Sequence, residues 1–410
     1  MGALLKDLFG IFSFSFVPII FCLFSLTLLT DGESFLNLAA FFLVVVLLIE
    51  LPINSYQDWD YGHDRLFQGQ LVFSIFAFTG YLLVFLWYWM APSNDFLGLG
   101  ALSLNSFGLD VIASRESSGL IQTAAAVFLA VAASLFLSVI VGHELIHKRH
   151  GSILYRVGVF AHIITFFSYF SISHPTGHHY TVATKKDHAS PRRGESVYHF
   201  MWRSRSGKQK HTIEQEKKRL TNIQLPFWHW KNEALRNWFF EAILALSLII
   251  YGGWQGLFAI VIIGLSSNVF IEVINYLQHY GLLREMGKPI EARHIWSSNR
   301  ALLNRLYFGA GRHAIHHTGV EDYWRYSGGS DKDPQILTGL MTTAYISFIP
   351  FLFKRLMNRK LMDWDWNLAS TEEQRLAVEA CKVSGDKDLI AHGKKLESHL
   401  QRTSPNSKTA

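Results

Sequence analysis

The stretch LIQTAAAVFLAVAASLFLSVIVGHELIHKRH, residues 120–150, joins a long apolar run to a short polar segment rich in histidine. A helix needs about 20 apolar residues to cross a bilayer, and Leu120–Val141 is long enough. Its end carries His143, Glu144 and His147, which gain nothing from contact with lipid. The stretch therefore predicts a membrane span with a polar site at one end.

The rest of the chain has the composition of a membrane protein. Half of its 410 residues are apolar and 17% are charged, whereas soluble domains contain about a quarter charged residues. Together with Leu120–Val141, five more runs predict an all-α, polytopic transmembrane bundle of about six spans: Ile11–Leu29, Phe35–Ile53, Leu71–Met90, Trp238–Tyr251 with its flanks, and Leu257–Leu277. Two shorter runs are expected not to cross: Val157–Ser173 is a partly buried or re-entrant helix, and Ile336–Phe353 lies at the interface.

The charges predict the orientation of this bundle. The segment from Lys148 to Arg236 contains 16 Lys and Arg residues, whereas the loop 31–34 contains none. Because basic loops stay in the cytoplasm, this segment and both termini are expected there, with the regions of Glu33, Ser93 and Gly253 outside. The net charge of +6 gives no reason to expect a nucleic-acid partner. The two cysteines, Cys22 and Cys381, support neither a disulfide framework nor an iron–sulfur cluster.

Histidines gather beyond the ends of the expected spans. The chain has 19, and nine of them form four groups that we predict to be metal ligands: His143 and His147; His174, His178 and His179; His279; and His313, His316 and His317. Residues spaced i,i+4 project from one face of a helix, which applies to His143 with His147 and to His174 with His178. Neutral imidazole binds zinc, copper, iron and nickel. Nine ligands are too many for one ion, so two ions with four or five histidines each are expected.

Other interpretations explain less of the sequence. His162 stands alone in an apolar run and is expected to be a hydrogen-bonded core residue. In a membrane zinc protease, Glu144 would be the general base between His143 and His147, but seven histidines would have no role. A metal transporter would need polar residues along its spans, which offer only Glu50 and Glu272 near their ends.

The four groups, in this order, resemble those of the integral-membrane alkane 1-monooxygenases, which belong to a wider group of membrane di-iron hydroxylases and desaturases. The resemblance rests on four motifs: HELIHK, GHHYTVATKKDHAS with RRGES, NYLQHYGLL, and RHAIHH. The segment Asn275–Gly281 separates alkane-type hydroxylases from desaturases. The likeness extends from the first span to Arg359, so a membrane-embedded hydroxylase domain at 1–360 and a polar cytoplasmic tail at 361–410 are expected.

The resemblance implies two irons per chain, held by the nine histidines, at the cytoplasmic end of a six-helix bundle in the inner membrane. It also implies O2-dependent terminal hydroxylation of an n-alkane with electrons from rubredoxin and its reductase, and no catalytic residue beyond the metal ligands. An alkyl-aromatic or fatty-acyl hydroxylase of the same superfamily remains open. This chain departs from the family at Ser173 and Gln278, where glutamate is usual, and at Ile315 and Val320. These departures bear on redox tuning and substrate range.

Two further expectations follow from the proposed chemistry. A hydrocarbon dissolved in the bilayer is expected to reach the histidines through a tunnel between the helices, which needs no polar anchor. Lone Gly-x-Gly strings at 98 and 309 do not support a nucleotide fold, so electrons must come from a separate protein. The basic segment Arg203–Lys210, with Lys217–Arg219, is a candidate docking surface for an acidic carrier.

In the tail, Ser370 and Glu373 predict a capping box that starts a soluble helix, and disorder is expected after Ser404.

Overall fold

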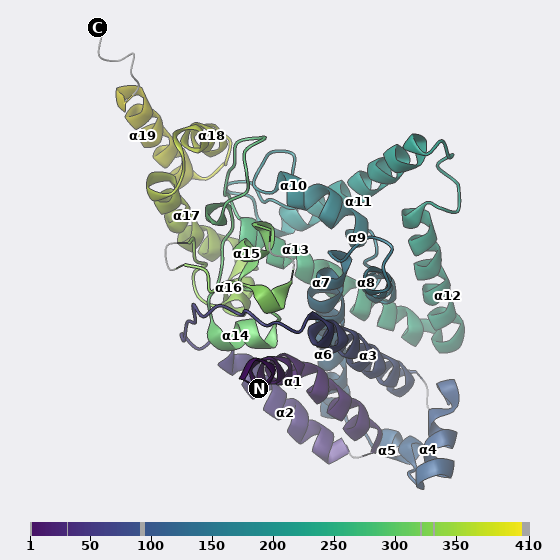
Figure 1. Cartoon of the computed structure of the whole chain (residues 1–410). Coiled ribbons are helices and arrows are strands. Elements are labelled where there is room, and N and C mark those ends of the chain that lie inside the picture. The colour runs from purple at the N-terminus through teal and green to yellow at the C-terminus, as the bar shows by residue number, and fades with distance from the viewer. Residues whose placement is uncertain (1, 31, 91–94, 320–321, 331–332, 404–410) are drawn as a thin grey trace.

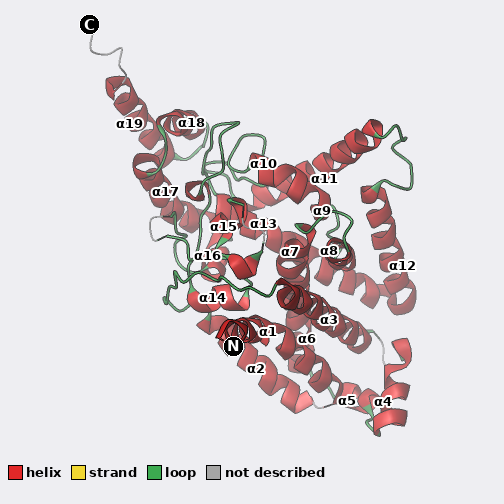
Figure 2. Cartoon of the chain, viewed as in Figure 1, coloured by secondary structure: helices red, strands yellow, loops and turns green. Residues whose placement is uncertain are grey.

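The chain folds almost entirely into helices (Figures 1 and 2). The computed structural model describes residues 2–30, 32–90, 95–319, 322–330 and 333–403. Within these ranges the only extended pairings are two isolated bridges, Asn54–Arg300 and Ser297–Gln335. The expectation of an all-α fold is therefore confirmed.

Four helices are long and apolar enough to cross a membrane: Leu4–Thr30, Asp64–Trp89, Leu120–Ile146 and Glu233–His279. These segments contain α1 (Gly2–Thr30), α3 (Asp64–Trp89), α6 (Leu120–Leu135) with α7 (His143–Ile146), and α12 (Glu233–Ile260) with α13 (Ser266–His279). The last segment holds two expected spans, because the backbone of Gly253 leaves the helical region between them, at φ 54° and ψ −130°. The protein is thus a multi-pass membrane protein, while the number of six spans stays a prediction.

The expected span Phe35–Ile53 is shorter in the structure than in the sequence analysis. Its helix, α2 (Gly32–Leu48), ends five residues early. The Glu50 carboxylate, just beyond the helix, accepts hydrogen bonds from the backbone N–H groups of Met341 and Thr342, at 3.2 and 3.3 Å. These donors lie in the first turn of α16 (Leu340–Ser347), so Glu50 caps that helix instead of continuing its own.

The run Val157–Ser173 does not cross the bundle. It forms α8 (Ile153–Ile164), a turn, and α9 (Phe170–Ser173). Twelve helical residues span about 18 Å, too little for a bilayer. His162 on α8 is buried, and its Nε2 lies 2.9 Å from the Ser138 carbonyl oxygen. The expectations of a partly buried helix and of a core histidine in this run are both confirmed.

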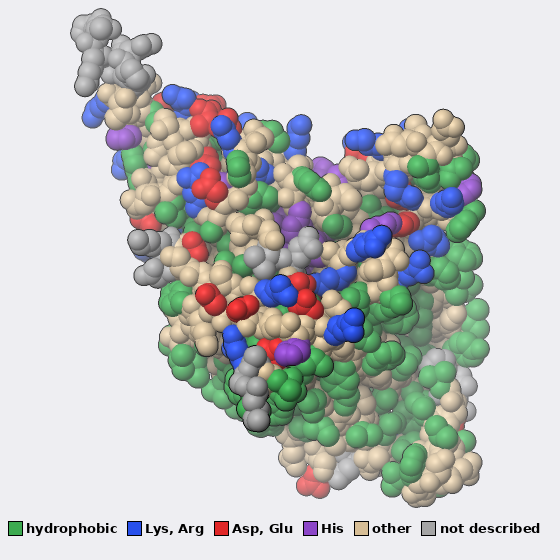
Figure 3. All heavy atoms as spheres, viewed as in Figure 1, with side chains coloured by type: hydrophobic (Ala, Val, Ile, Leu, Met, Phe, Trp, Pro, Cys, Tyr) green, Lys and Arg blue, Asp and Glu red, His purple; other side chains and the backbone are tan. Residues whose placement is uncertain are grey.

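Polar and apolar elements lie at different ends of the molecule. Apolar side chains dominate the visible surface over α1–α6, which include α4 (Leu99–Phe107) and α5 (Val111–Glu116) (Figure 3). Inside this part, aromatic rings pack edge to face, as Phe21 does with Phe78 at 5.1 Å. Charged side chains gather over the other end, which holds α10 (His179–Thr181), α11 (Val197–Asn222), α15 (His313–His317), α17 (Pro350–Asn367), α18 (Thr371–Lys382) and α19 (Lys387–Thr403), with the short α14 (Ala301–Leu306) between.

The C-terminal residues are folded rather than loose. The Ser370 side chain accepts from the Glu373 N–H, and the Glu373 carboxylate accepts from the Ser370 N–H, so the predicted capping box of α18 is confirmed. The expected boundary after residue 360 falls inside α17, where Leu361 is buried. The residues expected to be disordered, from Ser404, lie outside the described ranges.

Candidate metal centre

The nine predicted histidines lie together in two groups, although they come from four separate parts of the chain. Each residue offers one ring nitrogen that lies within 4.8 Å of the others in its group. The groups adjoin, because the rings of His179 and His317 stack with centroids 4.4 Å apart. The five-histidine group is His143, His147, His174, His179 and His316, and the four-histidine group is His178, His279, His313 and His317.

A π-helical turn divides the second motif between the two groups. His174–His178 form this turn, and the His179 N–H donates to the His174 carbonyl. Because a π-turn pairs residue i with i+5, His174 lies beside His179, and their Nε2 atoms are 3.0 Å apart. His174 and His178 still lie side by side, as expected, with ring centroids 5.2 Å apart, but they belong to different groups. Two more π segments precede His143 and α13, at Phe136–Gly142 and Val261–Leu265.

The nitrogens of the five-histidine group converge as ligands of one ion do. His174 Nε2 lies 2.8 Å from His143 Nε2 and 3.0 Å from His179 Nε2, and His179 Nε2 lies 3.1 Å from His316 Nε2. Nitrogens bound at ~2.1 Å and at right angles around a metal would be ~3 Å apart. Burial, and then the neighbouring rings, hold the pKa of His174, His179 and His316 well below the usual value. This direction favours the neutral ring, which is the form that binds metal.

The four-histidine group contains buried nitrogens with no hydrogen-bond partner. Both ring nitrogens of His279 are unpartnered, as are Nε2 of His178 and Nδ1 of His317. Each unsatisfied buried polar atom costs about 1–3 kcal/mol. A cation bound at the group would satisfy the one nitrogen that each ring offers to it, so the residues present fit a metal at each group.

Two polar side chains fix the rings from outside. The Asp187 carboxylate lies 2.9 Å from His178 Nδ1 and accepts from the Ser190 hydroxyl at 2.6 Å. The Tyr326 hydroxyl lies 3.0 Å from His316 Nδ1. Such contacts set the tautomer of a ligand and leave Nε2 free for metal. Neither Asp187 nor Tyr326 was predicted from the sequence, although Asp187 lies within the motif GHHYTVATKKDHAS.

The family departures lie close to these rings. Gln278 donates through Nε2 to the Ala310 carbonyl at 2.9 Å, and so ties the end of α13 to the segment before His313. The Ser173 hydroxyl is buried without a partner. Ile315 is partly buried against the apolar core. Val320 lies outside the described residues.

Glu144 is not free to act as a base. It accepts from Lys148 Nζ at 3.1 Å and from the Tyr323 N–H at 3.4 Å, and Lys148 also contacts Asp322 at 2.6 Å. Its role in this structure is to hold the loop at 322–323 against α7. This arrangement, with three more histidines around His143 and His147, disfavours the zinc-protease interpretation.

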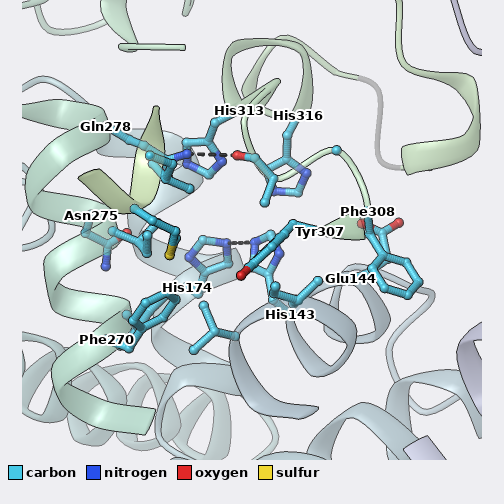
Figure 4. A pocket seen from close by; sticks show the side chains of 18 of the residues that line it. His143, Glu144, His174, Phe270, Asn275, Gln278, Tyr307, Phe308, His313 and His316 are labelled. Carbon is cyan, nitrogen blue, oxygen red and sulfur yellow. Dashed lines mark hydrogen bonds between the residues drawn. The ribbon is translucent and has the colours of Figure 1, made fainter. Parts of the chain in front are cut away.

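Two neighbouring cavities with largely apolar walls lie between the apolar surface and the histidines. A small chamber of about 50 Å³ is lined by His143, His174, His313 and His316 and by apolar side chains of α13 (Figure 4). A second cavity of about 280 Å³ lies between α2, α6, α13 and α16. Four residues line both spaces and form a neck between them: Ile140, Phe270, Tyr307 and Met341. At the far end Phe128 and Tyr345 line the cavity and are exposed, so it opens on the apolar surface.

A polar cleft approaches the five-histidine group from another side. It measures about 860 Å³, and its walls include His147 and His179. Arg149 and Lys218 also line this cleft and are exposed. The candidate docking segment Arg203–Lys210 is less available, because Lys208 is buried in an ion pair with Glu272 at 2.5 Å and Arg203 pairs with Glu195.

Comparisons with known proteins agree with the histidine motifs. The fatty acid desaturase family model matches residues 120–319. Alkane 1-monooxygenase 1 of Pseudomonas aeruginosa is 26% identical over 371 residues, which cover 83% of this chain and 96% of that protein. Alkane 1-monooxygenase 1 of Alcanivorax borkumensis is 32% identical over 58% of this chain and 61% of its own length. The hydroxylase component XylM of the Pseudomonas putida xylene/toluene monooxygenase is 29% identical over 60% and 66%. The resemblance is confirmed.

Proposed function

We propose that this chain, a divergent relative of the alkane 1-monooxygenases, is a membrane hydroxylase that uses two irons and O2 to hydroxylate the terminal carbon of an n-alkane. The observation that carries the proposal is the meeting of two histidine groups with an apolar cavity at one chamber. An unactivated C–H bond offers no charge for acid–base catalysis to use, so the oxidant must come from O2 at a metal.

The nine histidines would hold the two ions, five at one and four at the other. The bound irons would supply the reduction of O2, for which the substrate gives two electrons and a protein donor gives two. The chain's own residues orient the ligands and exclude water. Asp187 and Tyr326 fix two of the rings, and the apolar walls of the chamber keep bulk solvent away from the C–H bond.

The shape of the route supports a chain-like substrate. A chamber of about 50 Å³ behind the four-residue neck admits the end of an alkyl chain more readily than a ring. The outer cavity can hold the rest of the chain by apolar contact alone, because aliphatic and aromatic side chains make up most of its lining. Likeness to XylM supports methyl hydroxylation of an alkylbenzene as the second candidate, since a methyl group could also enter the neck.

The polar cleft is the proposed entry for electrons. His147 and His179 reach its wall, so a donor seated there would stand next to two ring edges of the five-histidine group. The exposed Arg149 and Lys218 favour an acidic partner of the rubredoxin type. The donor would then dock on the cytoplasmic face of the inner membrane, a side that the basic segment from Lys148 to Arg236 also supports.

The test is product analysis with labelled oxygen. Membranes that contain this chain, a rubredoxin and its reductase would receive n-alkanes of several lengths, alkylbenzenes and fatty acids under ¹⁸O2. We expect 1-alkanols that carry one ¹⁸O atom. A labelled benzyl alcohol or hydroxy acid in their place would redirect the substrate class. Absence of labelled product from every compound, with two irons bound, would overturn the proposed function.

A further inference from the structure

We infer that the three C-terminal helices, α17–α19, are a clasp that positions the four-histidine metal site. The inference rests on the proposed function, since it assumes that His178, His279, His313 and His317 hold a metal. Its basis is a buried network that joins these helices to the two segments that carry His178 and His279.

Arg193 is the centre of this network. Its guanidinium makes two hydrogen bonds of 2.6 Å to the carboxylate of Asp365 on α17, and both side chains are buried. The same carboxylate lies 2.9 Å from Nε2 of His392 on α19, and Arg193 Nη1 lies 3.3 Å from Sγ of Cys381 on α18. Arg193 therefore contacts α17 and α18 directly, through Asp365 and Cys381. It is linked to α19 through Asp365, which also contacts His392.

Arg193 also reaches the backbone just after His279. Its Nε donates to the Gly281 carbonyl at 3.1 Å, and the Gly281 N–H donates to the Pro191 carbonyl at 3.2 Å. Gly281 has a positive φ of 67°, and a Cβ there would lie 2.6 Å from Leu361 of α17. The helix thus packs directly on a backbone position two residues from a predicted ligand, where only glycine fits.

A second contact fixes Tyr280, which lies between His279 and Gly281. The Tyr280 hydroxyl donates to the Asn358 side chain of α17 at 3.1 Å and accepts from the Gly194 N–H at 3.2 Å. Gly194 also packs against the loop between α18 and α19, where an added Cβ would lie 2.3 Å from the Ser384 carbonyl oxygen. Tyr280 and Gly281 therefore have little conformational freedom, and they restrict the position of the neighbouring His279.

The other end of the network leads to His178. Only five residues separate Asp187, which contacts His178, from Arg193. Within this short loop, the Ser190 hydroxyl donates to the Asp187 carboxylate. Arg203 holds the middle of this loop at the carbonyls of His188 and Ser190. Loss of the Arg193–Asp365 pair would loosen the Arg193 end of the loop, and so weaken the support of the contact that orients His178. The contacts described for the five-histidine group do not pass through this network.

The inference predicts a selective loss of metal. Metal-free protein in detergent would be titrated with Co²⁺ and followed by absorbance, in the unaltered chain and in Asp365→Asn and His392→Ala. We expect two bound ions in the unaltered chain. In Asp365→Asn one site should weaken about 10–100-fold while the other keeps its affinity, as expected when the support of a ligand is lost. His392→Ala leaves the Arg193 pair in place, so its effect should be smaller and at the same site.

The matched control is Lys382→Ala. It removes an exposed ion pair between Lys382 Nζ on α18 and the Glu397 carboxylate on α19, which are 3.0 Å apart, and it should change neither site. Equal weakening of both sites in Asp365→Asn would show a general folding defect and overturn the inference. The inference would also be overturned if both sites kept their affinity in Asp365→Asn and in His392→Ala. If the unaltered chain fails to bind two ions, the proposed function fails instead. Should Asp365→Asn not fold, His392→Ala alone decides.

Discussion

His174 and His179 lie five residues apart in the chain, and their Nε2 atoms are 3.0 Å apart in the structure. On an α-helix they would point about 140° apart, because each residue turns the helix by about 100°. The π-turn brings the His174 and His179 side chains to the same side of the helix, and His178 then belongs to the four-histidine group. The backbone thus distributes adjacent histidines between the two histidine groups.

The first prediction concerns the metal itself. Purified protein should contain close to two irons per chain and little zinc, because five and four histidines converge on two points. Removal of the metal by a chelator should lower the melting temperature, since unpartnered nitrogens such as those of His279 would return. Elemental analysis and thermal unfolding measure both effects. One metal per chain, or zinc throughout, would contradict the two-iron site.

The second prediction tests His279. His279→Ala should abolish product and weaken metal binding at least tenfold, because even the loss of a supporting residue costs about 10–100-fold. Iron content and turnover in membranes are the measurements.

His188→Ala is the control for His279. His188 is near the second motif but belongs to neither histidine group, and its ring packs against Gly207 of α11. This variant should keep most of its activity and its iron. Similar behaviour of the two variants would remove the assignment of His279.

The sequence predicted the histidine centre more completely than the helices around it. Apolar length and the His-x-x-x-His spacing depend only on local periodicity, so the bundle and all nine histidines could be found. The π-turn at His174 could not, because one extra residue in a turn leaves no mark in the pattern of apolar residues. Nor could the early end of α2, which depends on a contact between Glu50 and α16, almost 300 residues away. Long-range contacts also place Tyr326 and Asp365.

The third prediction concerns the outer cavity. Ala132 lines this cavity, whose walls contain no histidine, so Ala132→Phe should fill part of the space without disturbing the metal. Long n-alkanes should lose at least tenfold in kcat/KM, while short ones change little. Iron content should stay constant. Ala124→Phe is the matched control, because Ala124 is exposed on the same helix and lies outside the cavity. Equal rates for all chain lengths in Ala132→Phe would place the substrate elsewhere.

The fourth prediction tests the orientation in the membrane. Single cysteines at Ser106 and Lys210, two exposed positions, would be introduced after replacement of Cys22 and Cys381 by serine. An impermeant thiol reagent should label position 106 in intact cells, and position 210 only after the membrane is opened. The basis is the basic segment from Lys148 to Arg236. External labelling of position 210 would contradict a site that faces the cytoplasm.

The last prediction concerns the electron donor. Arg149 and Lys218 are exposed in the cleft whose wall includes His147 and His179, and each would attract an acidic protein. Arg149→Glu and Lys218→Glu should therefore raise the KM for a rubredoxin several-fold at low salt, with kcat less affected. The difference from the unaltered chain should shrink as salt screens the charges, because the Debye length falls from about 30 Å at 0.01 M to about 10 Å at 0.1 M. Lys210→Glu is the control, since Lys210 is exposed on the same helix as Lys218 but does not line the cleft. Iron content should be the same in all three variants, which separates docking from damage to the centre. If Lys210→Glu weakens the donor as much as the cleft variants do, then the donor responds to the overall charge of this face, and the cleft is not its seat.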